Sequence, residues 1–298
     1  MAIAGTVLIS WLPLPVVRGL LQGVQRFWRL GASFAVEGLL KLGAGILLVS
    51  AGMGLSGAVA AISLGSLGAF AVTMIGLRRQ IAPRSVDVHP RGAFSIRTLI
   101  PYAIAVSTFA VLTQSDVVLV KILFPPAAAG VYAAASTGGK IVLYLTAPLA
   151  MAMLPEVVRR HSRNNGQRSV LLRTAAFGAL AGGLLVAAYL IAPRRIISLL
   201  FGAAYIEGAP LMWLVGLGML ANELALLGVY YLLATRRPAV LRWLSAHAVL
   251  FLVVLWAFAT RLEMVALLVA ATGVIACAGV WWSLRASDLA LQPQRQAV

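Results

Sequence analysis

The chain has 298 residues, of which 61% are hydrophobic and only 11% carry a charge. The mean hydropathy of +0.96 excludes an ordinary water-soluble domain, so we expect an all-α polytopic membrane protein. The net charge of +16 does not indicate a nucleic-acid partner, because most basic residues avoid the apolar runs and therefore fit basic loops on one side of a membrane.

Apolar runs of about 20 residues, the length that crosses a hydrocarbon core, predict about nine transmembrane helices. In chain order the predicted spans are 2–21, 30–50, 54–77, 98–120, 130–154, 170–192, 209–233, 239–259 and 263–284. The first span is the most irregular because it contains Pro13 and Pro15.

Basic residues alternate between successive loops. From the end of the first span to the tail, the loops hold 3, 0, 5, 1, 5, 2, 3, 1 and 2 lysine or arginine residues. The positive-inside rule then predicts an external N-terminus and a cytoplasmic C-terminus. An external start without a charged export signal suggests further spans before Met1; the alternative is a genuine nine-helix protein.

The first two spans contain three ionisable residues. Glu37 and Lys41 stand four positions apart in span two, which predicts an intrahelical ion pair of structural or functional importance. Arg18 lies near the end of span one, and we expect it to snorkel toward the cytoplasmic face.

Spans four and five place Asp116 and Lys140 well inside apolar segments. Each such charge costs about 2.5–3.5 kcal/mol on insertion scales, so it marks a candidate functional site. Four-residue steps give span five a polar stripe, made of Tyr132, Ser136, Lys140 and Tyr144. Either Asp116 and Lys140 pair with neighbouring helices to fix packing, or they line a translocation cavity together with Gln114 of span four; we favour the cavity.

Later segments hold isolated polar residues. Span seven contains Asn222 and Glu223, and span eight contains His247, which we interpret as a hydrogen-bonded packing residue in preference to a titrating site. The loop 193–210 predicts either a short helix in the outer interface or a longer last turn of span six.

Several motifs are absent from the sequence. It has no GxxxxGK[ST] phosphate loop and no HExxH motif, and Cys277 is its only cysteine. We therefore expect no ATP-driven transport, no disulfide, no metal site and no cofactor, and we do not expect an enzyme.

Four short motifs, the first of them made of two segments, follow a known pattern. Residues 114–120 and 129–135 read QSDVVLV and AGVYAAA, an aspartate near a helix end followed by an aGxYxaA helix start. Leu154-Pro155 precedes basic residues, 200–205 reads LFGAAY, and 15–23 reads PVVRGLLQG. Together these segments resemble polysaccharide flippases, the Wzx-like members of the multidrug/oligosaccharidyl-lipid/polysaccharide exporter superfamily.

The resemblance implies helices four to twelve of a twelve-helix, two-lobe transporter, with the first three helices missing. Residues 1–97 would form a partial first lobe of three helices and a basic cytoplasmic inter-lobe loop. Residues 98–284 would form the six-helix second lobe, and 285–298 a cytoplasmic tail. Such transporters alternate access by rocking one lobe against the other around a central cavity.

The resemblance also implies the activity. The expected substrate is an undecaprenyl-pyrophosphate-linked glycan moved across the cytoplasmic membrane, and the expected partners are membrane lipids, H⁺ or Na⁺ as coupling ion, and glycan-assembly membrane proteins. Lys140 and Arg18 are candidates for the pyrophosphate, and Asp116, Glu223 and His247 for coupling. The full set of cavity candidates is Lys140, Asp116, Gln114, Ser136, Tyr144, Arg18, Glu37, Lys41, Asn222, Glu223 and His247. The alternatives are an exporter of small drugs or metabolites and a membrane enzyme of glycan assembly.

Overall fold

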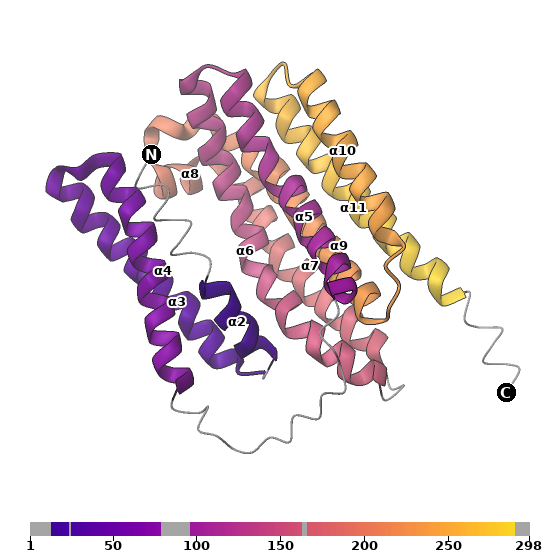
Figure 1. Ribbon diagram of the computed structural model, residues 1–298. Helices are drawn as coiled ribbons and strands as arrows, with labels where there is room; N and C mark the ends of the chain where they lie inside the picture. The colour runs from indigo at the N-terminus through magenta and orange to yellow at the C-terminus, as the bar shows by residue number, and fades with distance from the viewer. Residues whose placement is uncertain (1–12, 24, 79–95, 163–165, 290–298) are drawn as a thin grey trace, which may run out of the picture. The chain divides into compact units, whose positions relative to one another are not determined.

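The structure is a computed structural model that describes residues 13–23, 25–78, 96–162 and 166–289. All regular structure in these ranges is helical (Figure 1). Seven helical segments among them are long and apolar enough to cross a membrane, when the continuous stretch Phe27–Ile75 is counted as one segment. This confirms an all-α, multi-pass membrane protein. The described residues form two compact units, one before and one after residue 91.

The first unit is a helical hairpin with a short third helix. Its elements are α2 (Pro13–Gly23), α3 (Phe27–Leu48), a π-helical turn η1 (Val49–Met53) and α4 (Gly54–Arg78). The chain reverses at Gly52 and Gly54, whose φ angles of 86° and 50° disfavour residues with a Cβ atom. As a result α3 and α4 pack side by side, and α2 contacts both.

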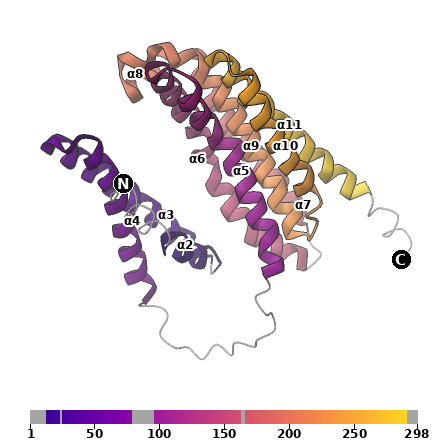
Figure 2. The same ribbon diagram turned by 45° about the horizontal axis from the view of Figure 1, so that its top comes forward.

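The second unit contains six long helices and two short elements. They are α5 (Ile96–Leu123), α6 (Pro126–Ser162), α7 (Gln167–Ile191), α8 (Pro193–Phe201), the 3₁₀ helix η2 (Ala203–Leu211), α9 (Met212–Ala234), α10 (Val240–Phe258) and α11 (Leu262–Leu289). Figure 2 shows the long helices of this unit side by side.

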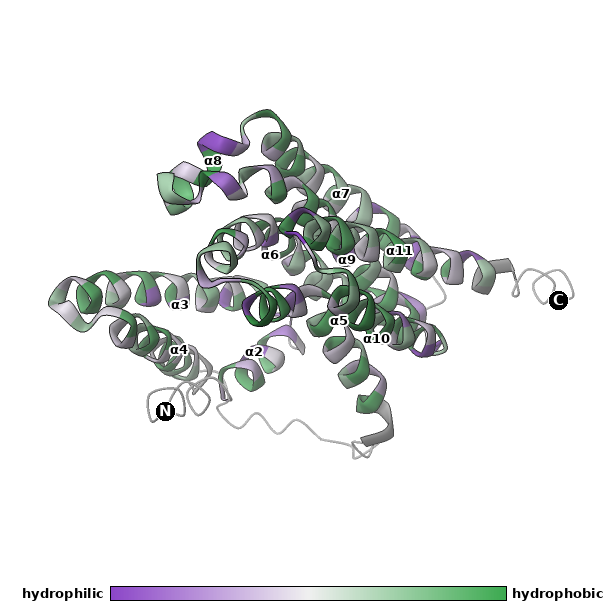
Figure 3. Ribbon diagram, turned by 90° about the horizontal axis from the view of Figure 1, so that it is seen from above, coloured by the Kyte–Doolittle hydropathy of each residue, from purple (hydrophilic) through white to green (hydrophobic). Residues whose placement is uncertain are grey.

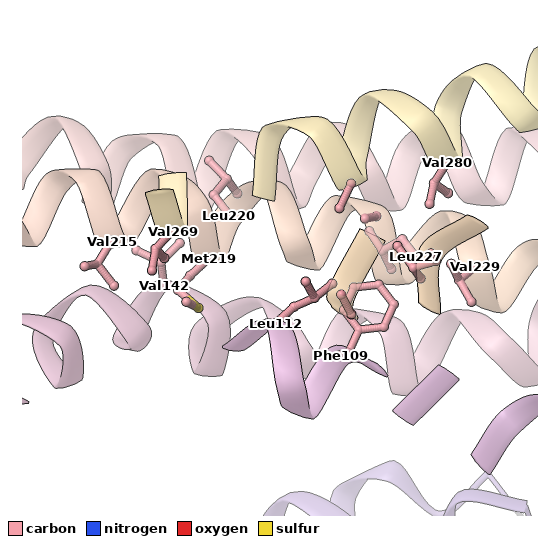
Figure 4. Close-up of a cluster of buried hydrophobic side chains, with 14 of the residues drawn as sticks. Phe109, Leu112, Val142, Val215, Met219, Leu220, Leu227, Val229, Val269 and Val280 are labelled. Atoms are coloured by element: carbon pink, nitrogen blue, oxygen red, sulfur yellow. The ribbon is translucent and has the colours of Figure 1, made fainter. Parts of the chain in front are cut away.

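Helix α9 is the centre of the second unit, because it packs against α5, α6, α7 and α11. Buried apolar side chains from these helices meet along it, among them Phe109, Met219 and Val269 (Figure 4). Small residues allow the closest approach: a Cβ atom on Gly218 would lie 2.6 Å from the carbonyl oxygen of Val269. Such glycine contacts are typical of helix packing in membranes.

Large apolar side chains also cover the outside of the helices, as hydrocarbon surroundings require. On α10, for example, Val249, Val253 and Trp256 are each more than half exposed. Figure 3 shows apolar residues along the helices of both units. This outward apolar surface is what distinguishes a membrane bundle from a soluble one.

Most predicted spans correspond to observed helices. Spans two to nine match α3, α4, α5, α6, α7, α9, α10 and α11, although α6 is longer than predicted at both ends. Of the first predicted span, residues 2–12 lie outside the described residues and 13–21 belong to α2. The loop 193–210 forms the separate helix α8 and then η2, so a longer span six is wrong; Ala192, with φ −134° and ψ 46°, ends α7.

Candidate ion-paired sites within the helices

A buried ion pair joins α5 to α6. Lys140 Nζ lies 2.9 Å from Asp116 Oδ1, and the two side chains are 5% and 0% exposed. The other carboxylate oxygen, Oδ2, accepts hydrogen bonds from Tyr132 Oη (3.0 Å) and Ser136 Oγ (2.7 Å). Gln114 Oε1 accepts a longer bond from Lys140 Nζ, at 3.4 Å. The cluster is therefore electrically neutral, and its carboxylate has three donors.

The helical repeat explains which members of the polar stripe join this cluster. Each four-residue step turns about 40° around a helix, so Tyr132, Ser136 and Lys140 stay within about 80° of each other. Tyr144 is turned about 120° from Tyr132, and its side chain is 60% exposed. The first three thus converge on Asp116, whereas Tyr144 points elsewhere.

Neighbouring helices pack closely against α6 beside this cluster. Next to Lys140, a Cβ atom on Gly139 would lie 2.7 Å from Val215 Cβ of α9, so α9 approaches α6 closely there. Tyr189 of α7 donates a hydrogen bond of 2.7 Å to the carbonyl oxygen of Gly138. In such surroundings an unpaired charge is costly, which explains why the carboxylate and the ammonium meet directly.

A second ionic cluster lies inside the first unit. Glu37 Oε2 is 2.7 Å from Arg18 Nη1, and Glu37 Oε1 is 2.5 Å from Lys41 Nζ. The predicted Glu37–Lys41 pair is thus present and is extended by an arginine from α2. Ser66 Oγ donates to Glu37 Oε1 at 3.3 Å. This cluster contains two cations and one carboxylate, so its formal charge is +1.

Arg18 is turned into the unit, and the expectation that it snorkels toward the cytoplasmic face is wrong. Its Nε and Nη2 donate to Ser33 Oγ and the Ser33 carbonyl oxygen at 3.0 and 2.9 Å. Its Cζ lies 3.8 Å from the centre of the Phe34 ring. Three acceptors and an aromatic face on α3 hold the guanidinium more favourably than a path along the helix surface.

A cavity of about 240 Å³ lies next to the cluster of Arg18, Glu37 and Lys41. Ser33 belongs to both, and Thr73 Oγ1 donates to Ser33 Oγ at 3.0 Å. The lining residues are Leu21, Arg29, Ala32, Ser33, Val72 and Thr73. With Arg29 in its wall and Arg18 behind Ser33, the cavity suits an anionic ligand.

The remaining candidates lie apart from both clusters. Asn222 and Glu223 of α9 are fully buried, and their side-chain polar atoms find no hydrogen-bond partner among the described residues. His247 Nε2 lies 3.1 Å from the Thr272 carbonyl oxygen, and its ring stacks on Trp243 with centroids 5.4 Å apart. His247 therefore links α10 to α11, as a hydrogen-bonded packing residue does.

Sequence reasoning missed the hydroxyl groups of the first unit. Ser33 is four residues before Glu37, and Ser66 is seven residues before Thr73, so each pair shares one helix face. That spacing could have predicted hydroxyl groups next to Glu37. In the described ranges, no group of three or more histidine, cysteine or acidic residues could hold a metal ion.

No protein-family model, curated protein or solved structure matches the chain. The class of the protein is therefore inferred from its fold and composition. They define a multi-pass membrane protein with ion pairs between its helices.

Proposed function

We propose that this chain is a membrane transporter of the polysaccharide-flippase type, which moves a pyrophosphate-linked glycan lipid from one leaflet to the other. The observation that supports this most directly is the cationic Arg18–Glu37–Lys41 cluster, which Ser33 joins to a cavity of the first unit. A pyrophosphate leaving water needs cations and hydroxyl donors inside the helices, and this region supplies both.

The two ionic clusters differ in how they would serve such a substrate. Lys41 is 32% exposed, so part of its side chain can be reached from outside the unit. Lys140 is 5% exposed and is neutralised by Asp116. In the conformation described, the first unit is the better candidate for headgroup binding. Separation of Lys140 from Asp116 would provide a second cation in another conformation, which is the kind of change that alternating access requires.

The proposal includes a membrane and an orientation. The alternating basic loops favour an external N-terminus and a cytoplasmic C-terminus in a cytoplasmic membrane. Proposed partners are membrane lipids, the glycan lipid, H⁺ or Na⁺ as coupling ion, and membrane proteins of glycan assembly. Translocation itself makes and breaks no covalent bond, so the chain would not be an enzyme.

The test is translocation by the purified chain in liposomes. The probe is a polyprenyl-pyrophosphate oligosaccharide with a fluorophore on the sugar, and dithionite in the outer medium reduces only the externally exposed label. We expect the chain to accelerate movement between leaflets, and Lys41→Met to slow it by about tenfold, equivalent to loss of one charged hydrogen bond. Lys121→Met, which removes an exposed cation of α5, is the matched control.

Two results would reject this function. One is a flip rate equal to that of protein-free liposomes; the other is equal acceleration of a labelled phosphatidylcholine, which would indicate unspecific scrambling. Mass spectrometry of the recovered glycan lipid distinguishes a flippase from an enzyme of glycan assembly. A polymerase or ligase would change the mass of the glycan lipid, and a flippase would not.

A second candidate, export of small cationic molecules, is favoured by Asn222 and Glu223. A buried carboxyl and a buried amide that have no hydrogen-bond partner in the described part of the chain are suited to a small cation. Efflux of a cationic dye from the same liposomes, abolished in Glu223→Gln, would support this candidate over glycan transport.

A further inference from the structure

A second cavity, of about 110 Å³, lies at one end of the second unit between α7, α9 and α11. Arg168 and Arg285 line it from α7 and α11, and both are exposed to the surroundings. Tyr231 and Trp281 provide aromatic walls, and three leucine side chains complete it. It is separate from the Asp116–Lys140 cluster, with which it shares no residue.

The aromatic walls of this cavity have fixed orientations. Trp281 Nε1 donates a hydrogen bond of 3.2 Å to the carbonyl oxygen of Leu224, so the indole ring is held against α9. Tyr231 is only 6% exposed. Among the lining residues that the structure describes, Arg168 and Arg285 are the charged ones, and the aromatic and leucine side chains provide the apolar part of the lining.

Further basic residues lie close in sequence to a helix that lines this cavity. Arg236 and Arg237 are the second and third residues after the end of α9, the helix that contributes Tyr231. At the end of α6, the carboxylate of Glu156 is already paired with Arg159 and Arg160. In sequence Asp288 is one turn beyond Arg285, and its side chain lies outside what the structure describes.

The volume and the charge of this cavity limit the kind of ligand that it can bind. Pockets for drug-sized molecules or sugars measure about 300–1,000 Å³, so a volume of about 110 Å³ is too small for them. A single phosphate group fits, and two planar guanidinium groups bind phosphate oxygens with paired hydrogen bonds. Tyrosine and tryptophan are the residues that line the headgroup level of a membrane protein.

An apolar surface leads away from this rim. On α7, Leu172 lines the cavity and is 46% exposed, and the same helix continues with Leu180 and Leu184, which are 62% and 64% exposed. Acyl chains attached to a phosphate at Arg168 can lie along these side chains. A free inorganic phosphate has no acyl chain that could pack against these leucine side chains.

We propose that this cavity binds the phosphate of an anionic phospholipid headgroup, with its acyl chains along the exposed face of α7. Basic pockets between transmembrane helices are suited to such headgroups. The site does not depend on the proposed transport activity, because it lies away from the clusters assigned to the glycan lipid.

The experiment measures which lipids stay bound to the purified full chain. The protein is placed in nanodiscs of phosphatidylcholine and phosphatidylglycerol, extracted gently, and weighed with its bound lipids by native mass spectrometry. We expect phosphatidylglycerol to be enriched over its share of the bilayer. In the double variant Arg168→Ala, Arg285→Ala we expect the enrichment to fall by about 25-fold, since each basic residue near the surface contributes roughly fivefold.

The matched control is the double variant Arg194→Ala, Arg195→Ala, which removes two exposed arginines of α8. It should retain the enrichment; an equal loss in both double variants would show unspecific surface attraction and overturn the proposal. Release of the lipid by excess inorganic phosphate would also overturn it, because the site would then be a free-anion site. If the alanine variant does not fold, Arg168→Lys, Arg285→Lys keeps the charge and removes the guanidinium geometry, and unchanged enrichment there would refute guanidinium recognition.

Discussion

Replacement of Asp116 by alanine removes the acceptor at the centre of the α5–α6 cluster. Lys140 is 4% exposed, and of the two side-chain acceptors of its ammonium group only Gln114 Oε1, at 3.4 Å, would then remain. The hydroxyls of Tyr132 and Ser136 would also lose their acceptor. The variant thus leaves a buried cation with one long hydrogen bond and no counter-charge, and two buried hydroxyl donors without their carboxylate acceptor.

The expected loss in the free energy of unfolding is about 3–5 kcal/mol, the cost of removing one partner of a buried ion pair. Lys140→Met should cost less, about 1.5–3 kcal/mol, because Asp116 retains two hydroxyl donors. The double variant Asp116→Ala, Lys140→Met should be more stable than the two single losses would predict. We expect a coupling energy of about 2 kcal/mol.

The measurement is unfolding in mixed micelles by titration with sodium dodecyl sulfate, followed by circular dichroism. Lys121→Met serves as the control, because this lysine is exposed near the end of the same helix, and its loss should change stability by no more than about 0.5 kcal/mol. A coupling energy within about 0.5 kcal/mol of zero would refute the direct pairing of Asp116 with Lys140.

Two further substitutions can be tested by the same titration. Glu37→Gln leaves Arg18 and Lys41 without their shared carboxylate, and should lower stability by about 1.5–3 kcal/mol; a change below about 0.5 kcal/mol would contradict the cluster. Gly218→Ala places a methyl group 2.6 Å from the carbonyl oxygen of Val269 and should cost about 2–3 kcal/mol. Gly183→Ala, with no atom within 4 Å of the new methyl, should change stability by less than about 1 kcal/mol, so equal losses at both glycines would contradict the close helix contact.

The hairpin of α3 and α4 shows what local pattern can predict. Two apolar runs separated by an uncharged, glycine-containing turn were sufficient to predict both helices and the reversal between them. Helix α8 shows the limit, because its apolar residues suited either a separate helix or a longer α7. The backbone at Ala192 decided between these alternatives.

The ionic clusters show which contacts the sequence of one helix predicts and which contacts depend on the packing of two helices. Four-residue spacing predicted the Glu37–Lys41 pair and grouped Ser136 with Lys140, because those relations lie within one helix. The partner across the interface was not predictable in this way. Arg18 meets Glu37 from another helix, and Tyr144 leaves the stripe because the helical repeat turns it away from Asp116.

The sequence by itself determined the class of the protein and the extent of most helices, since hydrophobic length and loop charge are local properties that a bilayer selects directly. Only the tertiary structure decided which buried charges neutralise one another and where cavities remain. Those outcomes depend on the rotation and spacing of helices that are distant in sequence. At Asp116 and Lys140 that packing turned two isolated charges inside apolar spans into one neutral, hydrogen-bonded pair.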